Sequence, residues 1–126
     1  GDRVDGPRVL RAWHRALEAG PYDGPGVWLH GDLLPGNVLV AHGHLSAVID
    51  WGGVGVGDPA ADLVAAWTIL GERGRRAFRD ASDYDEAAWE RARGWVIVQA
   101  AIALPYYWES WPEFAHASAR RLAAVS

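Results

Sequence analysis

The sequence predicts an α+β domain dominated by helix, on the strength of three observations. Apolar residues recur at helical spacing near the start of the chain and throughout its second half. Between residues 27 and 49, short apolar runs alternate with turn-forming residues, as in a small sheet. The length of 126 residues and the absence of internal repeats suit a single domain over residues 1–126.

The first expected element is a helix over residues 7–19. Asp5 is placed to accept hydrogen bonds from the first backbone amides, Pro7 suits the first turn, and Gly20 favours an end. One face of this helix carries apolar side chains at helical spacing, namely Val9, Leu10, Trp13, Ala16 and Leu17. The glycine- and proline-rich residues 20–26 predict a loop.

Three short runs predict strands at 27–30, 38–40 and 44–49. His42 and Gly43 lie between the second and third runs and predict a tight hairpin turn. Residues 52–57 read Gly-Gly-Val-Gly-Val-Gly, which predicts a flexible loop.

The rest of the chain is expected to be helical. Asp58 followed by Pro59 is typical of a helix start, because Asp caps free amides and Pro is preset for the first helical position. This helix is expected to end near Leu70. Beyond it we expect a short basic segment at 72–79 and helices at 85–104 and 112–125.

Composition excludes several classes of function. A net charge of −4 argues against nucleic-acid binding, which relies on neutralising phosphates. The absence of cysteine excludes disulfides and thiolate chemistry and suits the cytoplasm, where we expect the protein. No membrane partner is expected, because the longest apolar run, residues 95–104, is shorter than the about 20 residues of a span. All 12 basic residues are arginine, which excludes lysine chemistry within this chain.

The most informative stretch is residues 30–37, His-Gly-Asp-Leu-Leu-Pro-Gly-Asn, followed by Asp-Trp-Gly at residues 50–52. The order H-x-D-L-x-x-x-N and then D-aromatic-G is that of the catalytic and metal loops of kinases. Phosphoryl transfer needs a carboxylate near the attacking hydroxyl, for which Asp32 is the candidate. It also needs hard oxygen ligands for Mg²⁺, for which Asn37 and Asp50 are the candidates.

The histidines of this region have a less specific interpretation. His30 is expected to brace the loop, and Trp51 is expected to pack in the core. A metal-hydrolase cluster of Asp32 with His30, His42 and His44 is the weaker alternative. His42 and His44 flank a turn glycine and are expected to be exposed, and no second shell is evident.

From Val27 to Val64 the sequence resembles the aminoglycoside phosphotransferase family, antibiotic-kinase relatives of the protein kinases. The matching segments are V-W-L-H-G-D-L-L-P-G-N-V-L-V, L-S-A-V-I-D-W-G and G-V-G-D-P-A-A-D-L. The resemblance implies a kinase-like C-terminal lobe whose small β-hairpin carries the catalytic and metal loops. It implies Asp32 as catalytic base, Asn37 and Asp50 as ligands of the Mg²⁺ on ATP, and Asp62 as a brace of the catalytic loop.

The chain lacks the features of the other kinase lobe. It has no G-x-G-x-x-G hairpin and no lysine to pair with phosphates. We therefore expect it to be the C-terminal lobe alone, to need the missing N-terminal kinase lobe as its partner, and to be inactive by itself. A non-catalytic remnant remains an alternative, although Asp32, Asn37 and Asp50 are all present.

The substrate is expected to be a small molecule. Only seven residues separate Asp50 from Asp58, which leaves no room for a protein-kinase activation segment. An aminoglycoside-type antibiotic is the first expectation, and macrolide, choline-like, homoserine-like or sugar-amine substrates remain open. Asp58 is either a helix cap or a residue that also touches the site.

Four acidic residues are candidate substrate-binding groups: Asp83, Glu86, Glu109 and Glu113. The last two stand among aromatic residues, and acids mixed with aromatics suit a cationic or sugar-bearing substrate. For Asp83 and Glu86 the alternative is a solvated helix start, where acids interact favourably with the helix dipole. For Glu109 and Glu113 the alternative is a helix end packed on the core.

Overall fold

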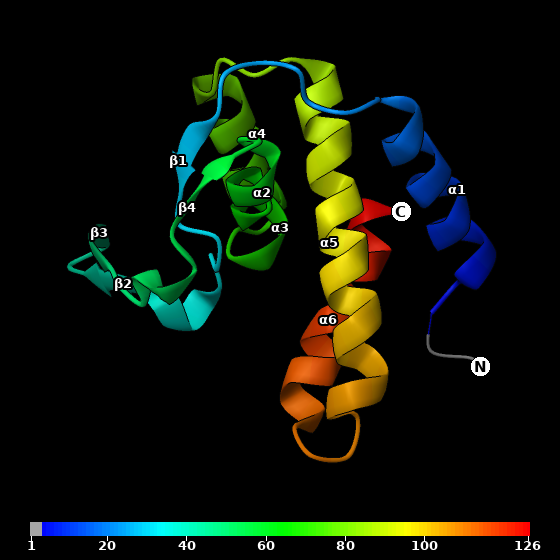
Figure 1. Ribbon diagram of the computed structural model, residues 1–126. Coiled ribbons are helices and arrows are strands. Elements are labelled where there is room, and N and C mark those ends of the chain that lie inside the picture. The colour runs from blue at the N-terminus through cyan, green and yellow to red at the C-terminus, as the bar shows by residue number, and fades with distance from the viewer. Residues whose placement is uncertain (1–3) are drawn as a thin grey trace.

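The structure is a computed structural model that describes residues 4–126, and it is mostly helical with two two-stranded antiparallel sheets (Figure 1). This agrees with the expected α+β class. The elements are α1 (Gly6–Glu18), β1 (Val27–Leu29), η1 (Pro35–Asn37), β2 (Val38–Ala41), β3 (His44–Val48), η2 (Trp51–Gly53), β4 (Gly55–Gly57), α2 (Ala60–Leu63), α3 (Ala65–Thr68), α4 (Glu72–Ala81), α5 (Glu86–Tyr107) and α6 (Pro112–Val125). None of the helices in residues 4–126 combines the length and the apolar character needed to cross a bilayer.

The long helix α5 is the centre of the molecule. Figure 1 shows α1 along one side of α5 and the sheets with α2–α4 on the other, while α6 runs beside it. The contact with α1 is close at Gly94, where an added Cβ would lie 3.0 Å from Ala16 Cβ. Small residues therefore let the two helices approach, and buried side chains of α2, α3, α5 and α6 fill the core around Trp89.

Helix α5 begins with a cap, as its sequence predicts. Asp85 lies before the first turn and its Oδ1 accepts a hydrogen bond from Ala88 N at 2.9 Å. Asp85→Ala is expected to lower the free energy of unfolding by about 0.5–2 kcal/mol, because it leaves that amide without its acceptor. Urea denaturation measures the effect. Asp83→Ala is the matched control, since the Asp83 carboxylate has no hydrogen bond or ion pair within residues 4–126 and an equal loss there would contradict the capping role.

The strands form a nested arrangement. β2 pairs with β3, with Val38 opposite Val48, and the turn between them has positive φ at both His42 (52°) and Gly43 (77°), as a tight hairpin requires. β1 pairs with β4 outside this hairpin, with Trp28 opposite Val56. The connections 30–37 and 49–54 therefore lie between the two sheets, side by side.

Several sequence predictions are wrong in detail. Residues 55–57 form β4 rather than a flexible loop, because Gly57 and Gly55 pair with both ends of β1. The helix expected from residue 58 to residue 70 is two short helices, α2 and α3, joined at Val64. The basic segment 72–79 lies within α4.

Helix α5 does not end before Pro105 but continues to Tyr107. Pro105 removes one backbone donor, and the turn beyond it is held by aromatic packing. The Tyr107 ring lies 5.2 Å from that of Phe114 and 5.8 Å from that of Trp111. Contacts between α5 and α6 therefore outweigh the local helix-breaking signal.

The apolar face assigned to α1 is only partly buried. Ala12 and Ala16 are buried, whereas Leu10 and Leu17 are 58% and 57% exposed. Large apolar side chains are also exposed over the sheets, including Trp28, Val40 and Leu45. Much of the apolar surface that the pattern predicts to be inside thus faces outward in this chain.

Candidate active site

The connections 30–37 and 49–54 meet through their backbones at two glycines. Gly31 has φ 86°, and a Cβ on it would lie 2.4 Å from Gly53 O. A Cβ on Gly53 would in turn lie 3.3 Å from His30 O. Only glycine at residue 31 permits both this backbone angle and this approach, so the two loops are fixed against each other.

His30 ties the same two loops together from inside. It is 3% exposed, and its Nδ1 accepts a hydrogen bond from Asp32 N at 3.1 Å. Because Nδ1 is an acceptor, the neutral ring carries its proton on Nε2, which donates to Ile49 O at 2.7 Å. These contacts are those of a bracing residue, and His42 and His44 lie apart from them at an exposed hairpin turn.

Trp51 was expected in the core, and this prediction is wrong. Its side chain is 53% exposed and lies edge-on to the His30 ring, with centroids 4.6 Å apart. Its Nε1 donates to Val48 O at 2.9 Å. Trp51 thus packs against the buried His30 ring while about half of its own side chain remains exposed.

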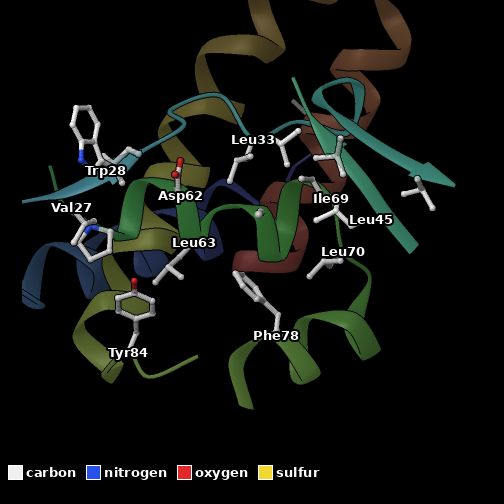
Figure 2. Close-up of a pocket in the computed structure, with 16 residues that line it drawn as sticks. Val27, Trp28, Leu33, Leu45, Asp62, Leu63, Ile69, Leu70, Phe78 and Tyr84 are labelled. Carbon is white, nitrogen blue, oxygen red and sulfur yellow. The ribbon is translucent and has the colours of Figure 1, made fainter. Parts of the chain in front are cut away.

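Asp62 on α2 holds the start of the first loop. Its two carboxylate oxygens accept hydrogen bonds from His30 N at 2.7 Å and from Gly31 N at 3.0 Å. Figure 2 shows this carboxylate directed toward the loop that carries Leu33, at the edge of an apolar hollow of about 580 Å³ beneath the hairpin. Thr68 of α3 adds a second tether, since its Oγ1 donates to Leu33 O at 2.6 Å.

Asp32 and Asn37 face each other across the first loop. Asn37 Nδ2 donates to Asp32 O at 2.8 Å and to Asp32 Oδ2 at 3.1 Å. The second carboxylate oxygen, Asp32 Oδ1, accepts no hydrogen bond within residues 4–126, and neither does the amide oxygen Asn37 Oδ1. One carboxylate oxygen is therefore available to accept a proton, and one amide oxygen is available as a neutral ligand.

Asp50 begins the second loop directly after the hydrogen bond that joins the two loops. Ile49 N donates to Asn37 O at 2.9 Å, and Asp50 follows Ile49 in the chain. Asp50 is in the left-handed region, with φ 60° and ψ 68°, a conformation that Asp and Asn tolerate better than most residues. Its carboxylate makes no hydrogen bond or ion pair with any residue of the described chain.

The donor set formed by Asn37 and Asp50 suits a hard divalent cation. It consists of one carboxylate and one amide oxygen, and Mg²⁺ is usually held by one or two protein oxygens together with phosphates and water. Within residues 4–126 no group of three or more His, Cys, Asp or Glu side chains could hold a metal ion. By residue type, one carboxylate and one amide suit a Mg²⁺ ion whose remaining ligands are phosphate oxygens and water.

Asp58 lies outside this arrangement. Its Oδ1 accepts from Ala60 N at 2.9 Å, and its Oδ2 pairs with Arg91 Nε of α5 at 2.8 Å. Both oxygens of the carboxylate are thus occupied, one as a helix cap and one as a link between α2 and α5. The structure favours the cap interpretation over direct contact with the site.

A hollow of about 370 Å³ opens beside Asp32, with α5 and α6 as its walls. Its lining is mainly apolar and aromatic, and includes Trp95, Ile102, Tyr107 and Phe114. None of the four acidic candidates lines it. Glu86 pairs with Arg79, Asp83 borders a separate hollow with Tyr84, and Glu109 and Glu113 are exposed near the α5–α6 turn.

Sequence reasoning missed two polar residues near Asp32. Thr68, the tether of Leu33, is the single polar residue in the apolar run from 63 to 70, which is a readable signal. Arg121 of α6 lines the Asp32 hollow, and nothing in its local sequence marks it. Its position depends on the packing of α6 against α5, which is a long-range property.

The sequence is similar to those of known proteins. The sequence model of APH, the phosphotransferase enzyme family, matches residues 3–95, a range that includes both loops. The uncharacterized protein YcbJ of Bacillus subtilis (strain 168) is 36% identical over 76 residues, which are 60% of this chain and 23% of that protein. The chain thus spans well under two thirds of this relative. With a family match over most of its length, the chain belongs to the phosphotransferase enzyme family.

Proposed function

We propose that this chain is the kinase-like C-terminal lobe of an ATP-dependent phosphotransferase that phosphorylates a hydroxyl group of a small molecule. The observation that carries the proposal is the contact of Asn37 with Asp32, in a loop whose Asn37 carbonyl accepts a hydrogen bond from Ile49, the residue before Asp50. Family membership supports phosphotransferase activity as the reaction class.

Asp32 is the proposed catalytic base. The substrate hydroxyl oxygen attacks the γ-phosphorus, its O–P bond forms, and the bond from the γ-phosphorus to the bridging oxygen of ADP breaks. The hydroxyl proton passes to Asp32 Oδ1, the oxygen that Asn37 leaves free. Such proton acceptance by a positioned carboxylate typically contributes about 10²–10⁴-fold to the rate.

Asn37 and Asp50 are the proposed ligands of Mg²⁺ on the ATP phosphates. When bound, Mg²⁺ neutralises charge on the phosphates and helps to orient them. Asn37 serves this role through Oδ1 while its Nδ2 keeps Asp32 oriented. The single amide therefore links the base to the metal ligands, and His30 and Asp62 hold the loop that carries it.

ATP would lie between this chain and an N-terminal kinase lobe, which we propose as its partner. The exposed apolar side chains over the sheets, such as Leu39 and Ile49, support a covering lobe there. The isolated chain is then inactive. Because ATP is an intracellular co-substrate, we propose a cytoplasmic location.

The proposed acceptor is a small molecule rather than a protein. The interval between Asp50 and Asp58 is filled by the η2 turn and β4, so it holds no extended activation segment. An aminoglycoside, which would make the protein an antibiotic-resistance enzyme, is the first substrate class to assay. Macrolides, choline, homoserine and amino sugars follow.

The test is an ATP-dependent phosphorylation assay on the complete gene product. Each of these substrate classes would be tested as an acceptor, with and without Mg²⁺. Release of ADP would measure turnover, and mass spectrometry would detect the phosphorylated acceptor. A phosphorylated alcohol whose formation needs Mg²⁺ and is lost in Asp50→Ala supports the proposal. Phosphorylation that survives Asp50→Ala unchanged contradicts the proposal, and a complete gene product that binds no ATP in the presence of Mg²⁺ favours a non-catalytic remnant.

A further inference from the structure

The hollow beside Asp32 indicates the chemical class of the acceptor. Its volume of about 370 Å³ is within the range of small-molecule sites. The walls contributed by α5 and α6 are apolar or aromatic, and Trp95 and Ile102 are among the exposed apolar side chains of these helices. An acceptor with an apolar body would therefore bury apolar surface on both sides.

The charged groups of this hollow do not suit a polycation. Asp32 is its only acidic residue, and the only other charged side chain is Arg121. A substrate with several amino groups would have to approach the Arg121 guanidinium with no carboxylate other than the proposed base to compensate. The hollow thus disfavours an aminoglycoside as the natural acceptor.

Arg121 has no anionic partner within residues 4–126. The ion pairs of the described chain use other arginines, at residues 76, 79, 91 and 93. Arg121 has one long hydrogen bond, from Nη2 to Thr68 O at 3.5 Å, and its guanidinium lies over the Phe114 ring at 5.5 Å. The remaining guanidinium donors have no acceptor within residues 4–126.

The electrostatic surroundings of Arg121 agree with an unfilled anion site. Burial, and secondarily the neighbouring charge of Arg120, lower the pKa of Arg121 from its ordinary value. Both causes disfavour the charged form, although arginine remains protonated. An anion placed against this guanidinium would remove that penalty and gain a charge-assisted hydrogen bond.

We propose that the natural acceptor is an alcohol with an apolar body and a single anionic group, which binds with its anion at Arg121 and its hydroxyl near Asp32. This rests on the proposed function for the identity of the reacting hydroxyl. The recognition of the anion depends on α6, which lies beyond residues 3–95 of the family match. The residue that would recognise the anion therefore lies outside the part of the chain that the family model matches.

Binding to the complete gene product without ATP tests the acceptor class. The probes are ω-hydroxyoctanoate, octanol and ω-amino-octanol, which share an apolar chain and a hydroxyl but differ in charge. Titration calorimetry should give ω-hydroxyoctanoate an affinity at least tenfold above octanol, with ω-amino-octanol weakest. Equal affinities, tightest binding of the amine, or no binding of ω-hydroxyoctanoate overturns the proposal.

Arg121 variants locate the anion. Arg121→Gln should weaken the binding of ω-hydroxyoctanoate at least tenfold and leave that of octanol unchanged. Arg121→Lys should retain part of the affinity, and Arg120→Gln should change it much less than Arg121→Gln. Arg120 is the matched control because it is adjacent but exposed and absent from the hollow. Circular dichroism checks the fold of each variant, and an Arg121→Gln protein that is folded yet binds normally overturns the assignment.

A fluorescence readout places the probe in the hollow. Trp95 lines it, so bound ω-hydroxyoctanoate should change tryptophan emission, and Trp95→Phe should remove most of that change while calorimetric binding persists. An unaltered emission change in Trp95→Phe would contradict this location. None of these measurements needs catalysis, so phosphorylation assays with Asp50→Ala report separately on the proposed function.

Discussion

Asp32→Asn is expected to lower kcat of the complete gene product by about 10²–10⁴-fold, because it removes the carboxylate that we propose as the acceptor of the hydroxyl proton. The substitution keeps the size of the side chain. Asn37 Nδ2 is still able to donate to the new amide oxygen and to the backbone carbonyl of residue 32. The loop should therefore retain its shape, and KM for the acceptor should change much less than kcat.

Steady-state kinetics with the acceptor found in the phosphorylation assay measures this effect. Asp83→Asn is the matched control, since Asp83 is exposed and borders a different hollow from the one that holds Asp32. Its kcat should be that of the unaltered protein. A kcat for Asp32→Asn within a few-fold of that value would remove Asp32 from the role of base.

Gly31→Ala is expected to destabilise the protein by about 2–4 kcal/mol, combining backbone strain with overpacking. The residue has φ 86°, which a side chain rarely adopts, and the new Cβ would lie 2.4 Å from Gly53 O. The neighbour is backbone, so relief requires the two loops to separate. Such a separation would also pull the backbone amide of Gly31 from Asp62.

Urea denaturation gives the size of this effect as a shift in midpoint at constant slope. Gly36→Ala in the same loop is the control, because an added Cβ at Gly36 meets nothing within 4 Å. Similar midpoints for the two variants would show that the approach of the loops contributes little to stability.

The parts of the site that could be predicted from the sequence are those fixed by short-range chemistry. Asp32 and Asn37 are five residues apart in one loop, and their contact follows from a tight connection between two strands. The cap of α5 and the turn at His42 are equally local. In each case the interacting groups are only a few residues apart in the sequence, so the local sequence pattern is enough to predict the contact.

The features that the sequence did not predict depend on distant partners. β4 has a glycine-rich sequence typical of a loop, and becomes a strand because β1 pairs with it. Pro105 predicts a helix end, yet packing of Tyr107 on Phe114 extends α5 beyond it. The placement of Arg121 in the Asp32 hollow likewise arises from the contact of α6 with α5.

The left-handed backbone of Asp50 has a consequence for how this protein can evolve. Of the residues that tolerate φ 60°, Asn and Gly remove the carboxylate while preserving the backbone, whereas Glu keeps the charge and loses that tolerance. The substitutions of Asp50 that accumulate during evolution should therefore be to Asn or Gly, and the resulting proteins should still fold. Under the proposed role of Asp50 as a Mg²⁺ ligand, a relative with either residue at this position is expected to fold but not to transfer phosphate.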